Sequence, residues 1–200
     1  MMNQPLPLNL VVEGIIDLEV MRVLLDYLDL PFRGLPPTVG KGKLLNNLPR
    51  YNAAARHSPW LVLVDLDQDA DCAPSFRAEK LPDPSSGMLL RVAVRAIEAW
   101  LLADREQMAA FLGVQINQVP AYPEGEANPK KTIVQLASKS RRKSLREDML
   151  PREGRGGLVG PGYSIRMIEF ARQHWRPGVA AQTADSLARC IRALLELKTQ

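Results

Sequence analysis

Two carboxylates, Asp65 and Asp67, stand at the end of the short apolar stretch formed by residues 61–64. Successive apolar residues predict a strand buried on both faces, as in the middle of a parallel sheet. Side chains two apart in a strand point to the same face, so both carboxylates should project from its carboxyl end, where open α/β sheets bind ligands. Two like charges held together repel, and a divalent cation, Mg²⁺ or Mn²⁺, removes that repulsion. The pair is a candidate metal site; the alternative is a pair of aspartates that only caps a loop.

A third acid, Glu13, ends the strand predicted over 6–12 and precedes Gly14, which permits a tight turn. An amphipathic helix is predicted over 15–30, with Asp17 in its first turn. For Asp17, attraction to the helix dipole and a role in the site both remain open. Glu13 is harder to explain by structure alone, because two strand ends of one predicted sheet then carry acids. Glu13 therefore joins the candidate metal ligands.

Glu98 lies near the start of the helix predicted over 96–111, directly after the strand predicted over 88–94. This position again places a carboxylate at the carboxyl end of a strand. A further metal-site acid and a partner of the helix dipole are both consistent with it. Asp104 comes late in the same helix, where the dipole disfavours an acid, so we expect Asp104 to have a specific partner.

The glycine- and lysine-rich stretch 40–43 is the next candidate for contact with a ligand. It fits a nucleotide-binding P-loop poorly, because Gly34 lies one residue too far back and Gly42 stands where Ser or Thr should follow the lysine. Lys41 and Lys43 could meet a phosphate near the start of the following helix, and a solvated lysine pair is the alternative. Asp69 and Asp71 lack the glycine and closing glutamate of a calcium loop; we interpret them as loop or helix-capping residues first and outer metal helpers second.

Apolar strands alternate with amphipathic helices along the first half of the chain, a pattern typical of an α/β domain with a parallel sheet flanked by helices. Strands are predicted over 6–12, 32–39 (interrupted by proline and therefore irregular or at an edge), 61–67 and 88–94, and helices over 15–30, 43–56, 74–80, 96–111, 129–138, 163–175 and 177–197. We expect an α/β core over 1–128, and a basic loop with a helical C-terminal extension over 129–200 packed on the same domain.

Positive charge is concentrated in residues 130–155. This segment has nine lysines or arginines and three acids, a net charge of +6, whereas the whole chain of 200 residues has +4. Such a concentration fits a phosphate backbone, and a solvated flexible loop is the alternative. The candidate nucleic-acid contacts, together with Lys41 and Lys43, are Lys130, Lys131, Arg141, Arg142 and Lys143.

The remaining composition excludes several classes of protein. No apolar run is long enough to cross a membrane, and the N-terminus lacks the charged start and apolar stretch of a signal peptide. Two distant cysteines form neither a disulfide framework nor a thiolate zinc site. We therefore expect a cytoplasmic protein that is not associated with a membrane.

The order and strand context of the acids resemble the toprim domain, the metal-dependent phosphodiester module of topoisomerases, primases and overcoming-lysogenisation-defect nucleases. Toprim domains have a strand ending in Glu-Gly with an Asp three residues further on, and a later strand ending in Asp-x-Asp. The matching residues are Glu13, Gly14, Asp17, Asp65 and Asp67. The resemblance implies a Rossmann-like parallel sheet, with Glu13 as general acid/base or metal ligand and both later aspartates as metal ligands.

A second resemblance covers more of the chain. Segments 96–104, 161–163 and 184–187 look similar to the bacterial toprim-like family called domain of unknown function 4276. Together the motifs lead us to expect a Mg²⁺-dependent (or Mn²⁺-dependent) nuclease that hydrolyses phosphodiester bonds in DNA or RNA, in bacterial defence against phage. Its catalytic and metal-binding residues would be Glu13, Asp65, Asp67 and Glu98. The alternative is a non-catalytic nucleic-acid-binding or regulatory subunit that acts with an ATPase partner.

Overall fold

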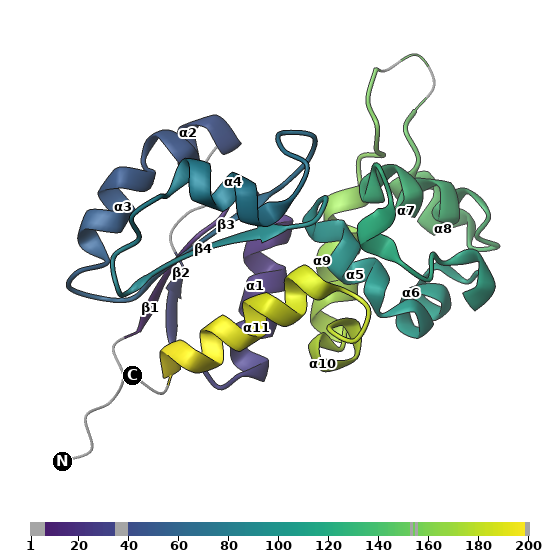
Figure 1. The fold of residues 1–200 in the computed structure, drawn as a ribbon. Helices are drawn as coiled ribbons and strands as arrows, with labels where there is room; N and C mark the ends of the chain where they lie inside the picture. Colours follow the sequence, from purple (N-terminus) through teal and green to yellow (C-terminus); the bar gives the residue numbers. More distant parts are fainter. Residues whose placement is uncertain (1–6, 35–39, 153, 155, 199–200) are drawn as a thin grey trace. The chain divides into compact units, whose positions relative to one another are not determined.

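The computed structural model describes residues 7–34, 40–152, 154 and 156–198, and the chain forms two compact units. The first contains residues 1–94 and 186–200, and the second contains residues 95–185 (Figure 1). This division differs from the expected one at residue 128. The physical reason is that helix α5 (Ile97–Ala103) packs against later helical segments of the second unit, while the last helix of the chain returns to the first.

The first unit is built on a four-stranded parallel sheet with the strand order β2-β1-β3-β4. The strands are β1 (Leu8–Val11), β2 (Phe32–Gly34), β3 (Trp60–Asp65) and β4 (Met88–Ala93). The predicted α/β class with a parallel sheet is confirmed, and β2 is the edge strand that its prolines predicted. The apolar stretch before Asp65 is an inner strand between β1 and β4, as its two apolar faces required. The tail of the predicted second strand, residues 35–39, lies outside the described residues.

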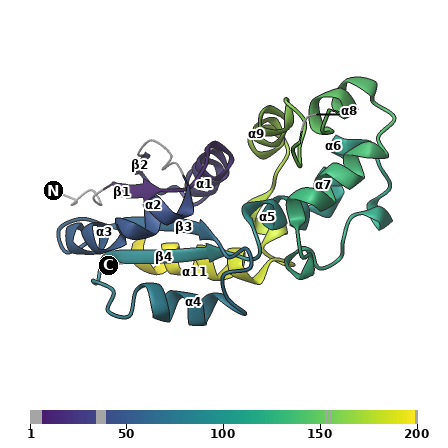
Figure 2. The same cartoon turned by 90° about the horizontal axis from the view of Figure 1, so that it is seen from above.

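Helices cover both faces of this sheet (Figures 1 and 2). One face packs against α2 (Lys41–Asn46), α3 (Leu48–Ala54) and α4 (Ala73–Lys80). The buried residues of that core are Val11, Leu44, Leu48, Ala55, Val62, Val64, Leu66, Phe76, Met88, Leu90 and Val92. The other face carries α1 (Ile15–Tyr27) and α11 (Asp185–Lys198). Strands β3 and β4 contribute alternate side chains to this core. The parallel pairing of β1 with β3 holds the carboxyl ends of these two strands side by side.

Two predicted long helices are each broken in the structure. The helix predicted over 43–56 becomes α2 and α3, because Pro49 at the start of α3 has no N–H to continue the preceding helix. The helix predicted over 177–197 becomes α10 (Pro177–Ala180) and α11. The short helix predicted over 74–80 is confirmed as α4.

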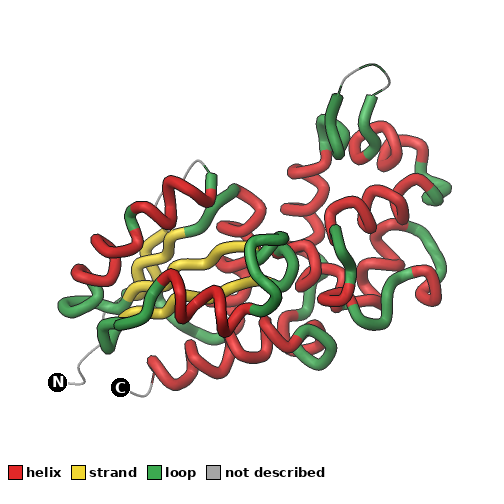
Figure 3. The backbone as a smooth tube through the Cα atoms, turned by 45° about the horizontal axis from the view of Figure 1, so that its top comes forward, coloured by secondary structure: helices red, strands yellow, loops and turns green. Residues whose placement is uncertain are grey.

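Helices, 3₁₀ turns and the loops between them make up the described residues of the second unit, which contain no strand (Figure 3). Its elements are α5, α6 (Arg105–Leu112), the 3₁₀ turns η1 (Ile116–Gln118) and η2 (Pro123–Gly125), α7 (Pro129–Ser138), α8 (Lys143–Met149), α9 (Tyr163–Gln173) and α10. The prediction of α7 is confirmed to the residue. The prediction of a loop over the basic segment is wrong for residues 143–149, where α8 buries Leu145 and Met149. None of the described helices is long and apolar enough to cross a membrane.

Asp104 breaks the helix predicted over 96–111 and has the specific partner that its position predicted. It separates α5 from α6 and accepts a hydrogen bond from the N–H of Gln107, so it caps the second helix. Its side chain is fully buried and accepts from Arg176 Nη2 at 2.7 Å, Nε at 2.9 Å and the backbone N–H at 3.0 Å. The carboxylate therefore fixes the corner between α5, α6 and the start of α10.

Replacing Asp104 with Asn is expected to lower the free energy of unfolding of the second unit by about 2–3 kcal/mol, since a buried charged acceptor of several hydrogen bonds is lost. Urea denaturation followed by circular dichroism measures this change. The matched control is Glu106→Gln, which removes the more exposed carboxylate that also contacts Arg176 at 2.8 Å. Equal small losses for both variants would contradict the special role of Asp104.

Candidate functional site

Glu13 and the end of β3 meet at the carboxyl edge of the sheet. β1 and β3 are neighbouring parallel strands, so the residues that follow them emerge at the same edge. The backbone N–H of Asp65 donates a hydrogen bond to Glu13 Oε1 at 3.0 Å. The structure therefore brings together two acids that are separated by more than fifty positions in the sequence, as their strand-end positions predicted.

Glu13 lies in a partly buried position that disfavours its charge. Burial raises the pKa of the Glu13 carboxyl above its ordinary value, and the Asp65 N–H and the Lys41 ammonium only partly offset this effect. The lack of a side chain at Gly14 leaves room for the Asp17 carboxylate, because a Cβ at Gly14 would lie 2.8 Å from the Asp17 Oδ2 atom. The first turn of α1 thus brings Asp17, which is buried, close to the same corner. A partly buried carboxyl group with a raised pKa is suited to exchange a proton or to bind a cation.

Asp67 lies outside strand β3, whereas the sequence predicts it at the end of that strand. The strand ends at Asp65, and Asp67 has a left-handed backbone with φ of 49°. The alternation of side chains in a strand therefore does not extend to Asp67, which lies in a turn. Aspartate tolerates this conformation better than most residues. Asp65 therefore ends the strand, whereas Asp67 lies in the turn that follows. The direction of the Asp67 carboxylate is set by the turn and not by the strand.

Lys41 neutralises the turn that follows β3. Its Nζ atom lies 2.6 Å from Asp67 Oδ2 and 2.7 Å from Asp69 Oδ2. The lysine side chain is only 15% exposed, whereas the two carboxylates are 57% and 46% exposed. The pKa of Lys41 is raised by these hydrogen bonds, which outweigh the opposing effect of burial, and Glu13 adds to the rise. The acids therefore already surround one positive charge.

This arrangement revises what we expected of Lys41 and Asp69. The sequence predicts either phosphate contact or full solvation for Lys41, and in the structure its ammonium contacts two acids. Asp69, predicted first as a loop or capping residue and second as an outer metal helper, belongs to this cluster. One signal pointed to the pairing, because a lysine in the first turn of a helix opposes the dipole and needs an acidic partner. Lys43 and Asp71 both lie exposed.

Glu98 belongs to the second unit and has its partners there. It is 1% exposed, its Oε1 atom accepts from the Tyr163 hydroxyl at 3.3 Å, and the Lys130 Nζ atom lies 3.4 Å away. Its Oε2 atom is buried with no hydrogen-bond partner among the described residues. A buried carboxylate oxygen in this state suits a cation or a proton. The contacts of Glu98 thus involve α7 and α9 rather than Asp65 or Asp67.

The basic side chains of the second unit divide into structural and exposed groups. Lys130 pairs with Glu98, and Arg142 donates to the backbone oxygen of Phe111 at 3.1 Å. The exposed positions include Lys131, Arg141 and Lys143, and the Lys143 ammonium lies 3.6 Å from a Glu147 carboxylate oxygen. Among the predicted nucleic-acid contacts, Lys130 and Arg142 therefore make contacts within the fold, while Lys131, Arg141 and Lys143 are exposed to solvent. Residues 153 and 155 of the basic segment lie outside the described residues.

Glu13, Asp65, Asp67 and Asp69 form what we call the carboxylate corner, and carboxylate oxygens are the ligands that Mg²⁺ and Mn²⁺ prefer. No group of three or more His, Cys, Asp or Glu side chains within the described parts of the chain is arranged to hold a metal ion. Mg²⁺ commonly uses only one or two protein carboxylates and keeps several waters. Asp65 and Asp67 are the residues that could hold such an ion; Glu13 accepts the Asp65 N–H, and the Lys41 ammonium is bonded to Asp67.

No protein-family model matches the chain, and no curated protein or solved structure matches it.

Proposed function

We propose that the chain is a Mg²⁺-dependent nuclease that hydrolyses phosphodiester bonds with the carboxylate corner of its first unit. The observation that supports this proposal most is the gathering of Glu13 and Asp65 at adjacent strand ends, joined by the hydrogen bond from the Asp65 N–H. Asp67, Asp69 and Lys41 complete a polar cluster at the same edge. The toprim-like order of the acids in the sequence agrees with this proposal.

Each residue of the corner has a distinct part in the proposed reaction. Asp65 and Asp67 would hold Mg²⁺, which neutralises the scissile phosphate and favours ionisation of a bound water. Glu13, whose pKa is raised by burial, would accept the proton of the attacking water and return it to the leaving oxygen as the phosphorus–oxygen bond breaks. Lys41 would pass from the carboxylates to a phosphate oxygen of the substrate, since an ammonium binds both kinds of anion.

Cleavage assays on defined substrates test the proposal. Single- and double-stranded DNA and RNA, labelled at one end, are incubated with the protein and Mg²⁺ or Mn²⁺. Metal-dependent cleavage that disappears in the Asp65→Asn variant is the expected result. Binding without cleavage on every substrate would instead favour the alternative below.

The alternative is a non-catalytic subunit that binds nucleic acid or regulates an ATPase partner. The contact of Lys41 with both Asp67 and Asp69 favours it, because an internal ammonium already neutralises the acids that a metal would need. The two functions differ in one property: only the nuclease requires the metal to displace this ammonium.

Replacing Lys41 with Met is therefore expected to tighten Mg²⁺ binding about fivefold, because an ion pair with half-exposed acids contributes about 1 kcal/mol that the metal must overcome. Isothermal titration calorimetry measures the dissociation constant. Lys43→Met is the matched control, since it removes an exposed lysine two residues away on the same helix. Equal tightening in both variants would mean that only net charge matters. Unchanged binding in both would show that Lys41 does not compete with the metal.

The exposed part of the basic segment should contribute to nucleic-acid affinity. Changing Arg141 and Lys143 to Ala is expected to reduce the slope of log K against log salt by up to about two for duplex DNA, since each phosphate contact contributes about 0.9. Fluorescence anisotropy over a range of salt concentrations measures the slope. Changing exposed Arg50 and Arg56 of the first unit to Ala removes the same charge elsewhere and serves as the control. Identical slopes in all three proteins would identify the segment as a solvated surface.

A further inference from the structure

Two aromatic side chains are exposed among the described residues, and both are tyrosines. Tyr27 is 57% exposed and Tyr122 is 63% exposed, whereas the other aromatic residues are buried or half-buried. An exposed aromatic ring can stack on a base of single-stranded nucleic acid, because the faces of an unpaired base are accessible. The two tyrosines are therefore candidate contacts for an unpaired base, and their surroundings decide between them.

The surroundings of Tyr27 do not suit a nucleic acid. This residue ends α1, and Asp26 and Asp29 beside it are both exposed. The Lys198 ammonium lies 3.4 Å from an Asp29 carboxylate oxygen, but the two carboxylates outnumber it. Carboxylates beside the ring repel the phosphates of a nucleic acid. Tyr27 is thus an exposed tyrosine that should not bind, and it provides a matched control for Tyr122.

At Tyr122 the neighbouring carboxylates are engaged within the second unit. Glu124 is 6% exposed, and its Oε2 atom accepts a hydrogen bond from the Asp185 N–H at 3.1 Å. Glu126 is half-buried, and its Oε2 atom accepts from the Thr132 hydroxyl at 2.7 Å. Both contacts hold the turn η2 in place. The surface beside Tyr122 therefore presents less negative charge than its sequence suggests.

Lysines supply exposed positive charge beside the same turn. Thr132 lies near the start of α7, so its hydrogen bond to Glu126 fixes η2 next to the beginning of that helix. Lys131 is exposed, and the Lys130 side chain is 42% exposed although its ammonium lies 3.4 Å from a Glu98 oxygen. Ammonium groups bind phosphate oxygens. One short folded segment thus combines an aromatic ring with two cations, the combination that binds single strands without regard to sequence.

Gly125 fixes the position of the Tyr122 ring. A Cβ at Gly125 would lie 2.6 Å from the Cδ1 atom and 3.0 Å from the Cε1 atom of the ring, so the ring packs against a residue that has no side chain. The Gly125 N–H also donates to the Tyr122 carbonyl at 3.1 Å, which closes the turn. Within the described parts of the chain, the Tyr122 side chain has no hydrogen bond and no contact with another ring. The ring is therefore preorganised, which lowers the entropy lost on binding a ligand.

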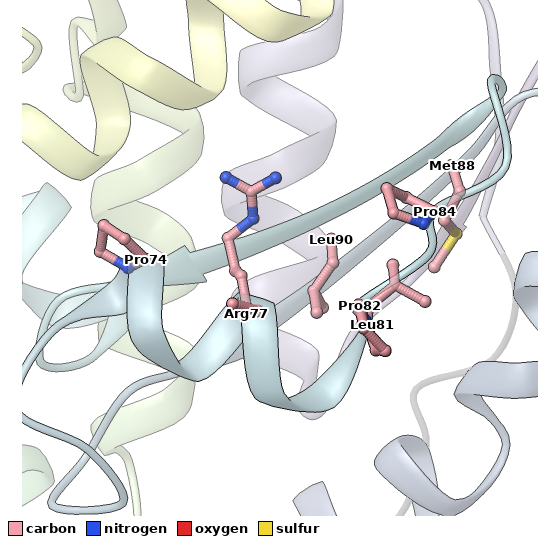
Figure 4. A pocket seen from close by; sticks show the side chains of 8 residues that line it. Pro74, Arg77, Leu81, Pro82, Pro84, Met88 and Leu90 are labelled. Carbon is pink, nitrogen blue, oxygen red and sulfur yellow. The ribbon is translucent and has the colours of Figure 1, made fainter.

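An apolar pocket in the first unit is less suited to a base. It lies beside α4 and β4, has a volume of about 250 Å³, and has Arg77 as its one charged lining residue (Figure 4). Its other lining residues are proline, alanine, leucine and methionine, so it contains no aromatic ring. Stacking therefore favours the surface around Tyr122 over this pocket.

We propose that Tyr122 stacks on an unpaired base of a single-stranded nucleic acid while Lys130 and Lys131 bind adjacent phosphates. These three residues form what we call the tyrosine surface. It selects unpaired bases because the bases of a duplex already stack on each other and cannot reach a side-chain ring. The inference rests on the proposed function in taking nucleic acid as the ligand. It narrows the substrate class to single strands and to unpaired ends or loops.

The test measures binding of the full chain to a short fluorescein-labelled deoxythymidine oligonucleotide by anisotropy, in EDTA so that no cleavage occurs. Tyr122→Ala should weaken binding about 5- to 150-fold, the effect of losing one base–aromatic stack. Tyr122→Phe keeps the ring and should bind as the wild type does. Gly125→Ala should also weaken binding, because the added Cβ displaces the ring. Tyr27→Ala removes the other exposed tyrosine and should change nothing.

An oligonucleotide of the same length without bases separates stacking from charge. Tyr122→Ala should not weaken its binding, whereas Lys131→Gln should weaken the binding of both oligonucleotides. The proposal would be overturned by a wild type that does not bind the deoxythymidine oligonucleotide, or by a Tyr122→Ala variant that binds it normally or loses affinity equally for both ligands. A dimer that sedimentation shows to separate in Tyr122→Ala would overturn it as well. Binding as expected, with no cleavage in Mg²⁺, would refute the nuclease and support this inference.

Discussion

Replacing Glu13 with Gln is expected to reduce metal-dependent phosphodiester cleavage by at least about 100-fold, the usual contribution of a positioned general acid or base. Gln has nearly the same shape and keeps an oxygen that accepts the hydrogen bond from the Asp65 N–H. The loss would therefore come from the missing proton acceptor rather than from a displaced strand end. Initial rates on end-labelled DNA and RNA measure it. Glu79→Gln, an exposed glutamate on α4, is the matched control and should retain full activity.

Stability of the metal-free Glu13→Gln variant shows whether folding is intact. The pKa of Glu13 is raised in the fold, chiefly by burial, so the fold favours its protonated form. That favourable contribution is present below the ordinary pKa near 4.5 and is lost as the pH rises through the raised pKa. At pH 7 the Gln variant should therefore be at least as stable as the wild type, and the difference should vanish in acid. A variant that is less stable at pH 7, or fully active, would contradict the role assigned to Glu13.

Changing Asp65 and Asp67 together to Asn is expected to abolish stabilisation by Mg²⁺. For the wild type, Mg²⁺ at one hundred times its dissociation constant should raise the free energy of unfolding by about 2.7 kcal/mol through mass action. Asn suits the left-handed backbone at Asp67 as well as Asp does, so the variant should fold. Urea titrations with and without Mg²⁺ measure the difference. Asp83→Asn, which changes an exposed aspartate in the turn after α4, should leave the stabilisation intact.

The sheet and the carboxylate corner were largely predictable because they depend on local patterns. Continuous apolar residues before Asp65 required an inner parallel strand, and the acid after β1 then had to lie at the neighbouring strand end. The same reasoning failed at Asp67, because strand alternation says nothing once the chain enters a turn. The break at Asp104 was missed for a related reason: a continuous apolar stripe predicts helical residues but not the corner made by a buried ion pair.

Long-range partners of charged residues could not be predicted. Lys41 carries a charge that suits phosphate or carboxylate equally, and only the fold decides that Asp67 and Asp69 lie within reach. Likewise, Glu98 follows a strand as Asp65 does, yet the chain leaves the sheet at that point and Glu98 packs with Tyr163 and Lys130 in the second unit. The position of an acid directly after a strand therefore identifies it as a candidate site residue. Its actual contacts depend on the path of the chain that follows the strand.

The most direct test of the central claim is the location of a bound Mn²⁺ ion by paramagnetic broadening in the amide NMR spectrum. Substoichiometric Mn²⁺ broadens the signals nearest to the ion, so no substrate or activity is needed. We predict selective broadening at Gly14, Asp65 and Leu66, and its loss in the variant in which Asp65 and Asp67 are both changed to Asn. Broadening that instead centres on the neighbours of Glu98, or that persists unchanged in the double variant, would contradict a metal site at the carboxylate corner.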